Sequence, residues 1–157
     1  MQEGREPEPE YDPVKVNDLV LPAALIAAIS DDRWAGIADP KTGTADYDLL
    51  EQVFGVRPFW PRFYSLAGIR AMNSSWVNET DIVYVGVPGD VNYPGDIDPR
   101  KSLLIAELGP DQLIALDYRR KSSPEVLYAA DDGTSPWKLV ASSVEELLEL
   151  LQVDELK

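Results

Sequence analysis

The chain of 157 residues contains no cysteine and no histidine, and these two absences exclude several kinds of chemistry. Without cysteine no disulfide can form, and the composition gives no indication of a redox compartment. Neither a Ser-His-Asp nor a Cys-His nucleophile can be assembled, and a zinc site built from the usual Cys or His ligands is excluded. A histidine general base working near neutral pH is excluded for the same reason.

Long apolar runs are also missing. No stretch of the chain approaches the roughly 18 apolar residues that cross a bilayer, and the chain does not open with a basic, apolar and then small-residue signal. We therefore expect a cytoplasmic protein that does not bind membrane. The turn from Gly86 to Asp90 lacks the Lys-Ser or Lys-Thr of a phosphate-binding loop, so we predict no nucleotide and no other cofactor.

Basic residues are scarce relative to acidic ones. The chain has 14 Lys and Arg against 28 Asp and Glu, which gives a net charge of −14. An acidic surface repels phosphate groups, so binding to nucleic acid or to anionic membranes is disfavoured. The same charge would steer the chain towards a basic protein partner, although it would also serve solubility alone.

The first thirteen residues differ in composition from the rest of the chain. Residues 1–13 are rich in Glu and Pro, and we expect a flexible acidic tail because this segment buries little apolar surface. Packing of the segment as an extended arm is the alternative. Residues 14–157 are long enough to form a single domain with a substantial core.

Helices are predicted mainly in the first half of the chain. Residues Leu21–Ile29 form one, with Pro22 at its first position, and Asp46–Phe54 form another that ends at Gly55. A third helix begins after Ser65. Its apolar stripe has helical spacing but is interrupted by one polar residue, and its members are Leu66, Ile69, Asn73 and Trp76.

The second half predicts a sheet followed by a helix. Short apolar runs separated by turn residues indicate strands at Ile82–Val87, Leu103–Glu107, Leu113–Tyr118, Val126–Ala129 and Trp137–Ala141. The final helix begins with a capping box from Ser143 to Glu146 and has one apolar face. The predicted fold class is α+β: a central, mostly antiparallel sheet of about five to six strands, flanked by N-terminal helices and a C-terminal helix.

An ordered set of short motifs in this half resembles the SUKH superfamily, which includes bacterial toxin-immunity proteins and a yeast cell-wall-synthesis regulator. The motifs span about fifty residues. They are Ile105-Ala106, Gly109-Pro110-Asp111, Leu116-Asp117-Tyr118, Pro124-Glu125-Val126, Trp137 and Ala141 to Glu146. In the first half, Leu21-Pro22 is similar to the family's Leu-Pro, whereas the family's Asn-Gly turn has no counterpart. The resemblance implies an α+β domain, residues 14–157, that binds and blocks a cognate toxin, often a nuclease.

Residues around two predicted strand ends are candidates for contact with such a partner. The first group, Asp117, Tyr118, Arg119 and Arg120, lies where a strand leads into a polar loop, and Tyr and Arg are common interface anchors. The alternative is structural, with Asp117 accepting turn amides and Tyr118 plugging the sheet. The second group is Asp131 and Asp132, in a predicted turn before a strand that opens with Trp137, the last candidate.

Other side chains indicate chemistry only weakly. The pair Asp96 and Asp98 offers too few ligands for calcium, so we predict no metal. Paired carboxylates could also hydrolyse glycosides, but nothing in the pattern separates these from surface acids, and we predict no catalytic residues. The aromatic cluster from Phe59 to Tyr64 is more typical of core than of a ligand site.

Three functional hypotheses therefore remain. The first is a non-enzymatic immunity protein that masks the basic active face of a secreted toxin domain. The second is a hydrolase that uses only carboxylates, with Asp96, Asp98 and Asp117 as possible participants. The third is an intracellular regulatory scaffold of the same fold. A toxin gene next to the gene for this chain would favour the first hypothesis over the others.

Overall fold

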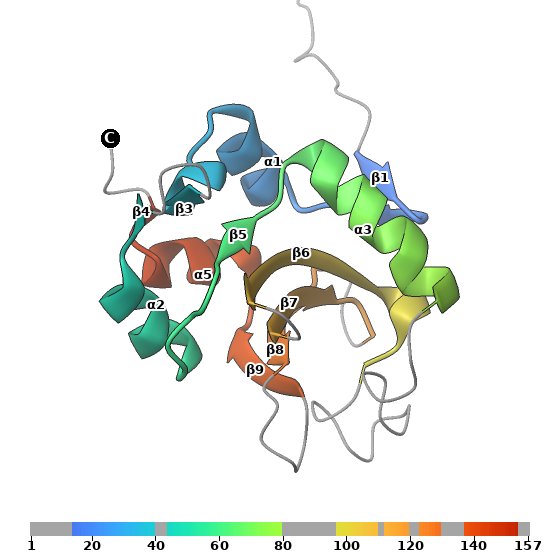
Figure 1. Cartoon of the computed structure of the whole chain (residues 1–157). Helices are drawn as coiled ribbons and strands as arrows, with labels where there is room; N and C mark the ends of the chain where they lie inside the picture. Colours follow the sequence, from blue (N-terminus) through green and yellow to red (C-terminus); the bar gives the residue numbers. More distant parts are fainter. Residues whose placement is uncertain are drawn as a thin grey trace, which may run out of the picture.

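The centre of the molecule is an antiparallel sheet of five strands (Figure 1). The computed structural model describes residues 14–39, 44–79, 97–109, 112–119, 123–129 and 137–153. The strands follow one another in the order β5 (Arg62–Phe63), β6 (Ser102–Gly109), β7 (Gln112–Asp117), β8 (Glu125–Ala129) and β9 (Trp137–Ala141). The α+β class is therefore confirmed. The last four strands are sequential neighbours because short connections join adjacent antiparallel strands.

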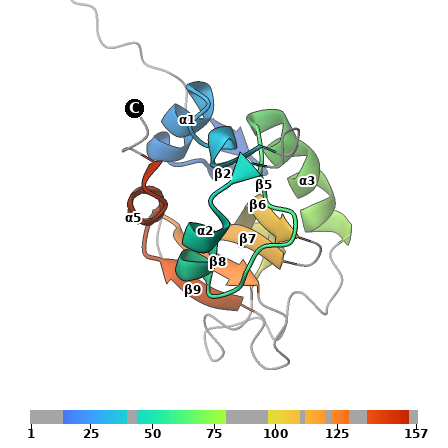
Figure 2. The same ribbon diagram turned by 60° about the vertical axis from the view of Figure 1, so that its left-hand side comes forward.

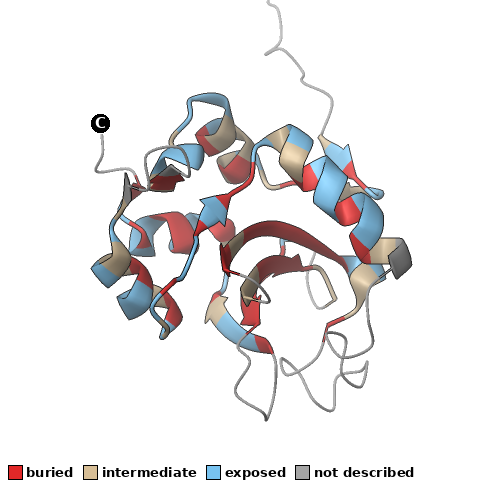
Figure 3. Ribbon diagram, in the orientation of Figure 1, coloured by how far each residue is buried: buried red, intermediate tan, exposed pale blue. Residues whose placement is uncertain are grey.

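The middle strands of the sheet are buried on both faces. Nearly every residue of β6 and β8 is buried, whereas the edge strands β5 and β9 are partly exposed, as the red and pale blue segments of Figure 3 show. Such strands have continuous apolar sequences, and Leu103-Leu104-Ile105-Ala106 in β6 is one. The register places Ser102 opposite Asp117 and Asp117 opposite Glu125, so polar residues of three strands meet at one end of the sheet.

The C-terminal helix α5 (Val144–Leu150) closes the domain by packing on β8, β9 and α1 (Ala23–Ser30). Ser143 caps it, because the Ser143 Oγ accepts a hydrogen bond from the Glu146 N–H at 3.1 Å. Leu147, Leu148 and Leu151 are all buried. The predicted Ser143 cap and the predicted apolar face are confirmed, whereas the Glu146 carboxylate accepts from the Ser142 N–H at 2.7 Å rather than from Ser143 as a capping box would. Figure 2 shows α5 beside the sheet, with α1 above it.

The helix α2 (Tyr47–Phe54) covers the same side of the sheet as α5 (Figure 2). The Asp46 carboxylate caps its first turn by accepting from the Leu49 N–H at 3.0 Å. Gly55 ends it with φ of +83°, a left-handed conformation that glycine adopts without strain. The Phe54 ring lies 5.7 Å from the ring of Tyr128 on β8, and burial raises the pKa of Tyr128 to about 12.

On the other side of the molecule, α3 (Leu66–Glu79) runs along β6, whose partner strand β5 is only two residues long. The Asn73 side chain takes the place of a strand there. Its Oδ1 accepts from the Leu104 N–H at 2.8 Å, and its Nδ2 donates to the Leu104 carbonyl at 2.9 Å. The same Nδ2 donates to the Ile69 carbonyl at 2.8 Å. The polar residue that interrupts the apolar stripe thus satisfies the backbone N–H and carbonyl of Leu104 at the strand edge.

Short elements fill the remaining corners. They are the hairpin of β1 (Lys15–Val16) and β2 (Leu19–Val20), the pair β3 (Ala38–Asp39) and β4 (Thr44–Ala45), and the 3-10 turns η1 (Ala35–Ile37) and η3 (Pro99–Lys101). The first hairpin turns through Asn17 and Asp18, both at positive φ, as a two-residue hairpin turn requires.

Two details differ from the sequence expectations, and a third expectation falls on residues that the structure does not describe. Pro22 is the N-cap of α1, in extended conformation, rather than its first helical residue. The strand β5 was not predicted, because two residues are too short to show an alternating pattern. The predicted strand Ile82–Val87 lies outside the described residues. Among the helices that the structure describes, none has the length and apolar character needed to cross a membrane.

Candidate functional site

The end of β7 holds the first group of candidate residues, and two of them form a buried ion pair. Arg119 donates to Asp117 from Nε, at 3.0 Å to Oδ1, and from Nη2, at 2.9 Å to Oδ2. The side chains are only 8% and 1% exposed, respectively. Asp117 Oδ1 also accepts from the Arg119 N–H at 3.0 Å. The turn-amide contact of the structural alternative is therefore present, and the ion pair keeps the buried carboxylate compensated.

The third member of this group, Tyr118, contacts a different element. Its hydroxyl donates to the Val20 carbonyl at 2.7 Å, and its N–H donates to the Lys101 carbonyl at 2.8 Å. Burial raises the pKa of the Tyr118 phenol well above its ordinary value. The side chain therefore ties the β1–β2 hairpin to the end of β7. The fourth member, Arg120, lies outside the described residues.

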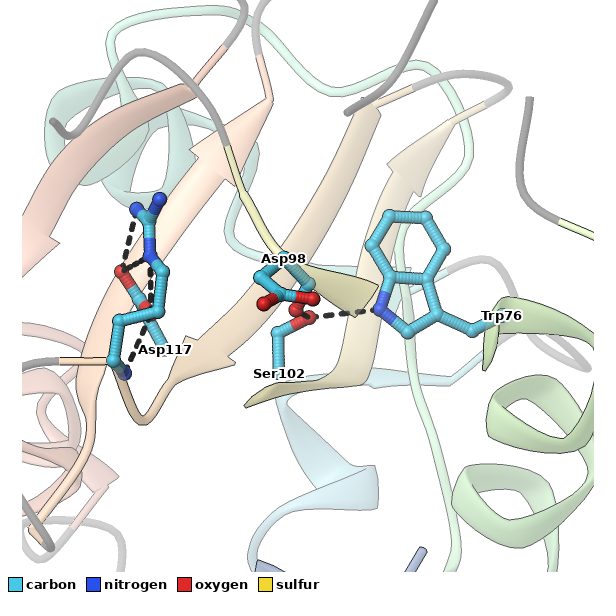
Figure 4. A network of polar contacts seen from close by, with 5 residues as sticks. Trp76, Asp98, Ser102 and Asp117 are labelled. Carbon is cyan, nitrogen blue, oxygen red and sulfur yellow. Dashed lines mark hydrogen bonds and ion pairs between the residues drawn. The ribbon is translucent and has the colours of Figure 1, made fainter. Parts of the chain in front are cut away.

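A second polar network lies beside the ion pair, at the start of β6 (Figure 4). Trp76 Nε1 donates to Ser102 Oγ at 2.9 Å, and Ser102 Oγ donates to the Asp98 carbonyl at 2.8 Å. The Asp98 carboxylate caps η3 by accepting from the Arg100 N–H at 3.0 Å. This network joins α3, η3 and β6 through groups that are buried or half-buried, and the sequence pattern did not predict it.

The carboxylates proposed for a hydrolase are occupied by structural contacts. Asp98 caps a turn, and Asp117 is buried against Arg119, so each carboxylate already has a local hydrogen-bond partner. Asp96 lies outside the described residues. Within the described ranges, no group of three or more Asp and Glu side chains is placed to hold a metal ion.

Trp137 is buried at the start of β9, with 1% of its surface exposed. Its ring lies 6.2 Å from that of Trp76 in an edge-to-face arrangement. The two candidates that precede it in sequence, Asp131 and Asp132, lie outside the described residues. Their role in partner binding remains a prediction.

Charge is distributed unevenly over the exposed surface. The helices α2 and α5 lie on one side of the molecule and contain no Lys or Arg. Their acidic side chains are all exposed and form what we call the acidic face: Asp48, Glu51, Glu145, Glu146 and Glu149. The side formed by α3, the β1–β2 hairpin and η3 instead carries exposed Lys15, Arg70, Arg100 and Lys101. Among the described residues the two sides therefore differ in charge, with Asp18 of the β1–β2 hairpin as an exposed acid among these bases.

Part of the acidic face is neutralised locally. Arg57 Nη1 lies 2.8 Å from Asp48 Oδ1 and 3.0 Å from Glu51 Oε1, and its guanidinium is 5.7 Å from the centre of the Tyr47 ring. Asp48, and to a smaller extent Glu51, raise the pKa of Arg57. All these groups are well exposed, so the pairs add little stability. The acids of α5 have no base on their own helix, so that part of the face is the more negative.

The aromatic cluster before β5 divides into two parts. Phe63 and Tyr64 are buried, as predicted, and the Tyr64 hydroxyl donates to Glu107 at 2.6 Å. Phe59 and Trp60 are 73% and 52% exposed, so the prediction of core was wrong for them. The two prolines beside them are buried in their place. The sequence does not reveal which aromatic side chains are exposed, because a run of aromatic residues predicts burial for all of its members alike.

A small cavity of about 220 Å³ lies between α2, η1 and the turn that follows α5. Its walls are mostly apolar, with Asp46 and Gln152 as polar members. The Asp46 carboxylate already caps α2, so the cavity contains no polar group arranged for catalysis.

Comparison of the chain with protein-family models, with curated proteins and with solved structures gave no match.

Proposed function

We propose that this chain is a non-enzymatic protein-binding module, an immunity protein of the SUKH type that masks a cognate bacterial toxin domain. The observation that carries the proposal is the acidic face, where every charged side chain of α2 and α5 is negative, while exposed bases gather on the side of α3. The net charge of −14 acts in the same direction. The assignment to the SUKH type is supported by the order of the short motifs in the second half of the sequence.

The mechanism is steric and electrostatic masking. A nuclease needs a positive surface to hold the phosphates of its substrate. A negatively charged protein can bind that same surface and so exclude the substrate. Complementary charge also speeds the encounter and rejects acidic or neutral partners. The protein would act in the cytoplasm of the cell that makes the toxin. Because masking needs no chemistry, the engaged carboxylates of Asp98 and Asp117 are consistent with it.

The proposal is tested with the toxin domain encoded beside the gene for this chain. Co-expression should restore growth of cells that make the toxin, and the two purified proteins should form a complex. The association rate should fall as ionic strength rises, because salt screens the steering field. An association rate that does not change with salt, or toxicity that persists in the presence of the complex, would contradict the proposal.

Matched charge variants locate the interface. Glu145→Gln with Glu149→Gln should slow association, because both residues lie on the acidic face. Ala71→Lys with Met72→Lys raises the net charge equally but on α3, where both positions are exposed, and should slow association less. Equal slowing by both pairs would mean that only the total charge matters and that the acidic face has no special role.

The remaining hypotheses give different results. A regulatory scaffold would bind a basic partner without protecting cells from a toxin. A hydrolase would show a reproducible turnover that Asp117→Asn abolishes while the fold, followed by circular dichroism, persists. We expect no turnover in a broad hydrolase panel.

A further inference from the structure

Two adjacent aromatic side chains stand out from the surface between α2 and β5. Phe59 and Trp60, here called the aromatic anchor, are 73% and 52% exposed. The prolines on either side, Pro58 and Pro61, are both buried. The chain therefore buries its smaller apolar residues at this point and turns the two larger ones outward, which is the reverse of the usual preference.

The backbone that carries the aromatic anchor is held in place. The N–H groups of Phe59 and Trp60 both donate to the Leu108 carbonyl at 2.9 Å, and each flanking proline has a restricted φ. A Cβ added at Gly109 would lie 3.2 Å from Phe59 Cβ, so the end of β6 approaches the anchor closely. The rings are thus presented by a fixed support rather than by a free loop.

These features are what an interface hot spot requires. Single exposed apolar side chains are common and need no explanation. A neighbouring Phe and Trp on a fixed backbone form a larger apolar unit, and Trp is enriched among residues that dominate binding energy. Because the support is already ordered, binding would lose little conformational entropy.

The net charge of the chain indicates which partner the anchor fits. The charged residues that flank the anchor, Arg57 and Arg62, are exposed bases. Arg57 pairs with Asp48 and Glu51 of α2, so the attraction comes from the overall charge. A second copy of the chain would bring another net charge of −14 to the same place, which opposes self-association. A basic protein has the complementary charge.

We infer that Phe59 and Trp60 insert into an apolar pocket of a basic protein partner, which the net charge of −14 attracts. The inference rests on the proposed function and adds the residues that supply most of the affinity. Electrostatics then sets the rate of association, and the aromatic anchor sets the rate of dissociation.

Trp60 is a built-in reporter for this contact. The chain has four tryptophans, and the others, Trp34, Trp76 and Trp137, are at most 5% exposed. Acrylamide quenching of the full-length chain therefore reports mainly on Trp60. The probes are an amphipathic helical peptide of Lys and Leu, which offers both charge and an apolar face, and poly-lysine, which offers charge alone.

Both probes should bind the chain at low salt, but only the Lys-Leu peptide should shield Trp60 from acrylamide and shift its emission to the blue. Phe59→Ser should weaken binding of the Lys-Leu peptide by roughly thirtyfold, the smallest loss that defines a hot spot. The same variant should leave poly-lysine binding unchanged. Met72→Gln is the matched control, since Met72 is 37% exposed on α3 and should matter to neither probe.

Each other outcome decides a separate point. If neither probe binds, the proposed function fails together with the inference. If both bind and Trp60 stays as quenchable as before, the anchor is wrong while the proposed function stands. If the chain alone sediments as a dimer that Phe59→Ser dissociates, a second copy covers the anchor and the inference is overturned. Should Phe59→Ser lower the unfolding temperature, Trp60→Gln followed by calorimetry provides the same comparison.

Discussion

The two junctions between helix and sheet are built in different ways. At the first, α5 and the residue after it pack the buried side chains of Leu147, Leu148 and Leu151 against the sheet and α1. At the second, α3 meets β6 through the buried amide of Asn73. Apolar contact tolerates small shifts because it has no direction, whereas the amide requires one alignment of helix and strand.

The difference explains why α3 carries a polar residue in the middle of its buried face. Among the strands that the structure describes, β5 is the one that pairs with this edge of β6, and it does so at Arg62 and Phe63, which leaves Leu104 beyond the paired residues. A leucine in place of Asn73 would fill the space but could not bond the backbone of Leu104. One position on the helix therefore has to satisfy a donor and an acceptor of the strand.

The largest expected effect comes from breaking the polar junction. Asn73→Ala leaves the N–H and the carbonyl of Leu104 unpaired in the interior, and we expect a loss of about 3–5 kcal/mol in the free energy of unfolding. Urea denaturation measures it. Ser75→Ala, at an exposed position of the same helix, is the control and should change stability by less than about 0.5 kcal/mol. A loss below about 1 kcal/mol for Asn73→Ala would mean that water replaces the amide.

A smaller effect is expected at the apolar junction. Leu148→Ala removes a buried side chain that is 5% exposed, and we expect destabilisation of about 2–4 kcal/mol because the cavity only partly collapses. Reversible urea unfolding is again the measurement, and Leu150→Ala, at a position 39% exposed, is the control. A loss below about 1 kcal/mol would show that this face of α5 is not packed and would remove the contrast between the junctions.

The cap of α5 should contribute less than either junction. Ser143→Ala removes the acceptor for the Glu146 N–H, and helix caps of this kind are worth about 1 kcal/mol. Thermal unfolding of Ser143→Ala and Ser143→Asp would separate the cap from a packing effect, because Asp caps as well as Ser. Equal destabilisation by both substitutions would exclude the capping explanation.

The smallest expected effect depends on pH. The backbone N–H of Ser142, and then its hydroxyl, lower the pKa of Glu146 from its usual value of 4.5. The folded state therefore favours the ionised carboxylate, whose contribution is complete above pH 4.5 and is lost as pH falls through the lower folded-state pKa. The stability difference between the wild type and Glu146→Gln should shrink on acidification. A difference that grows in acid would have the wrong sign.

Local patterns predicted the apolar junction but could not predict the polar one. The capping box at Ser143 and the leucine spacing of α5 are contained in a dozen consecutive residues. In the sequence, Asn73 is simply a polar residue that interrupts an apolar stripe. Its role is not evident there because its hydrogen-bond partner, Leu104, is 31 residues away. The exposure of Phe59 and Trp60 depends likewise on Leu108, far along the chain. Periodicity carries no information about such pairings.

At the candidate site, too, local patterns predicted only part of the hydrogen bonding. The turn contact of Asp117 with the Arg119 N–H is local, and the alternative based on local bonding predicted it. The guanidinium of Arg119 adds to it a buried ion pair that no spacing rule required. The outward position of the acids on α2 and α5 followed from the opposite, apolar faces of those helices.

Sealing the edge of β6 with a side chain also affects aggregation. An uncovered strand edge is a template on which another chain can add its own strand. While α3 is in place, the backbone of Leu104 is engaged by Asn73 and cannot accept a foreign strand there. If α3 detaches, this edge opens although β6, β7 and β8 remain paired. Aggregation should therefore follow the local release of one helix, at conditions milder than those that unfold the whole domain.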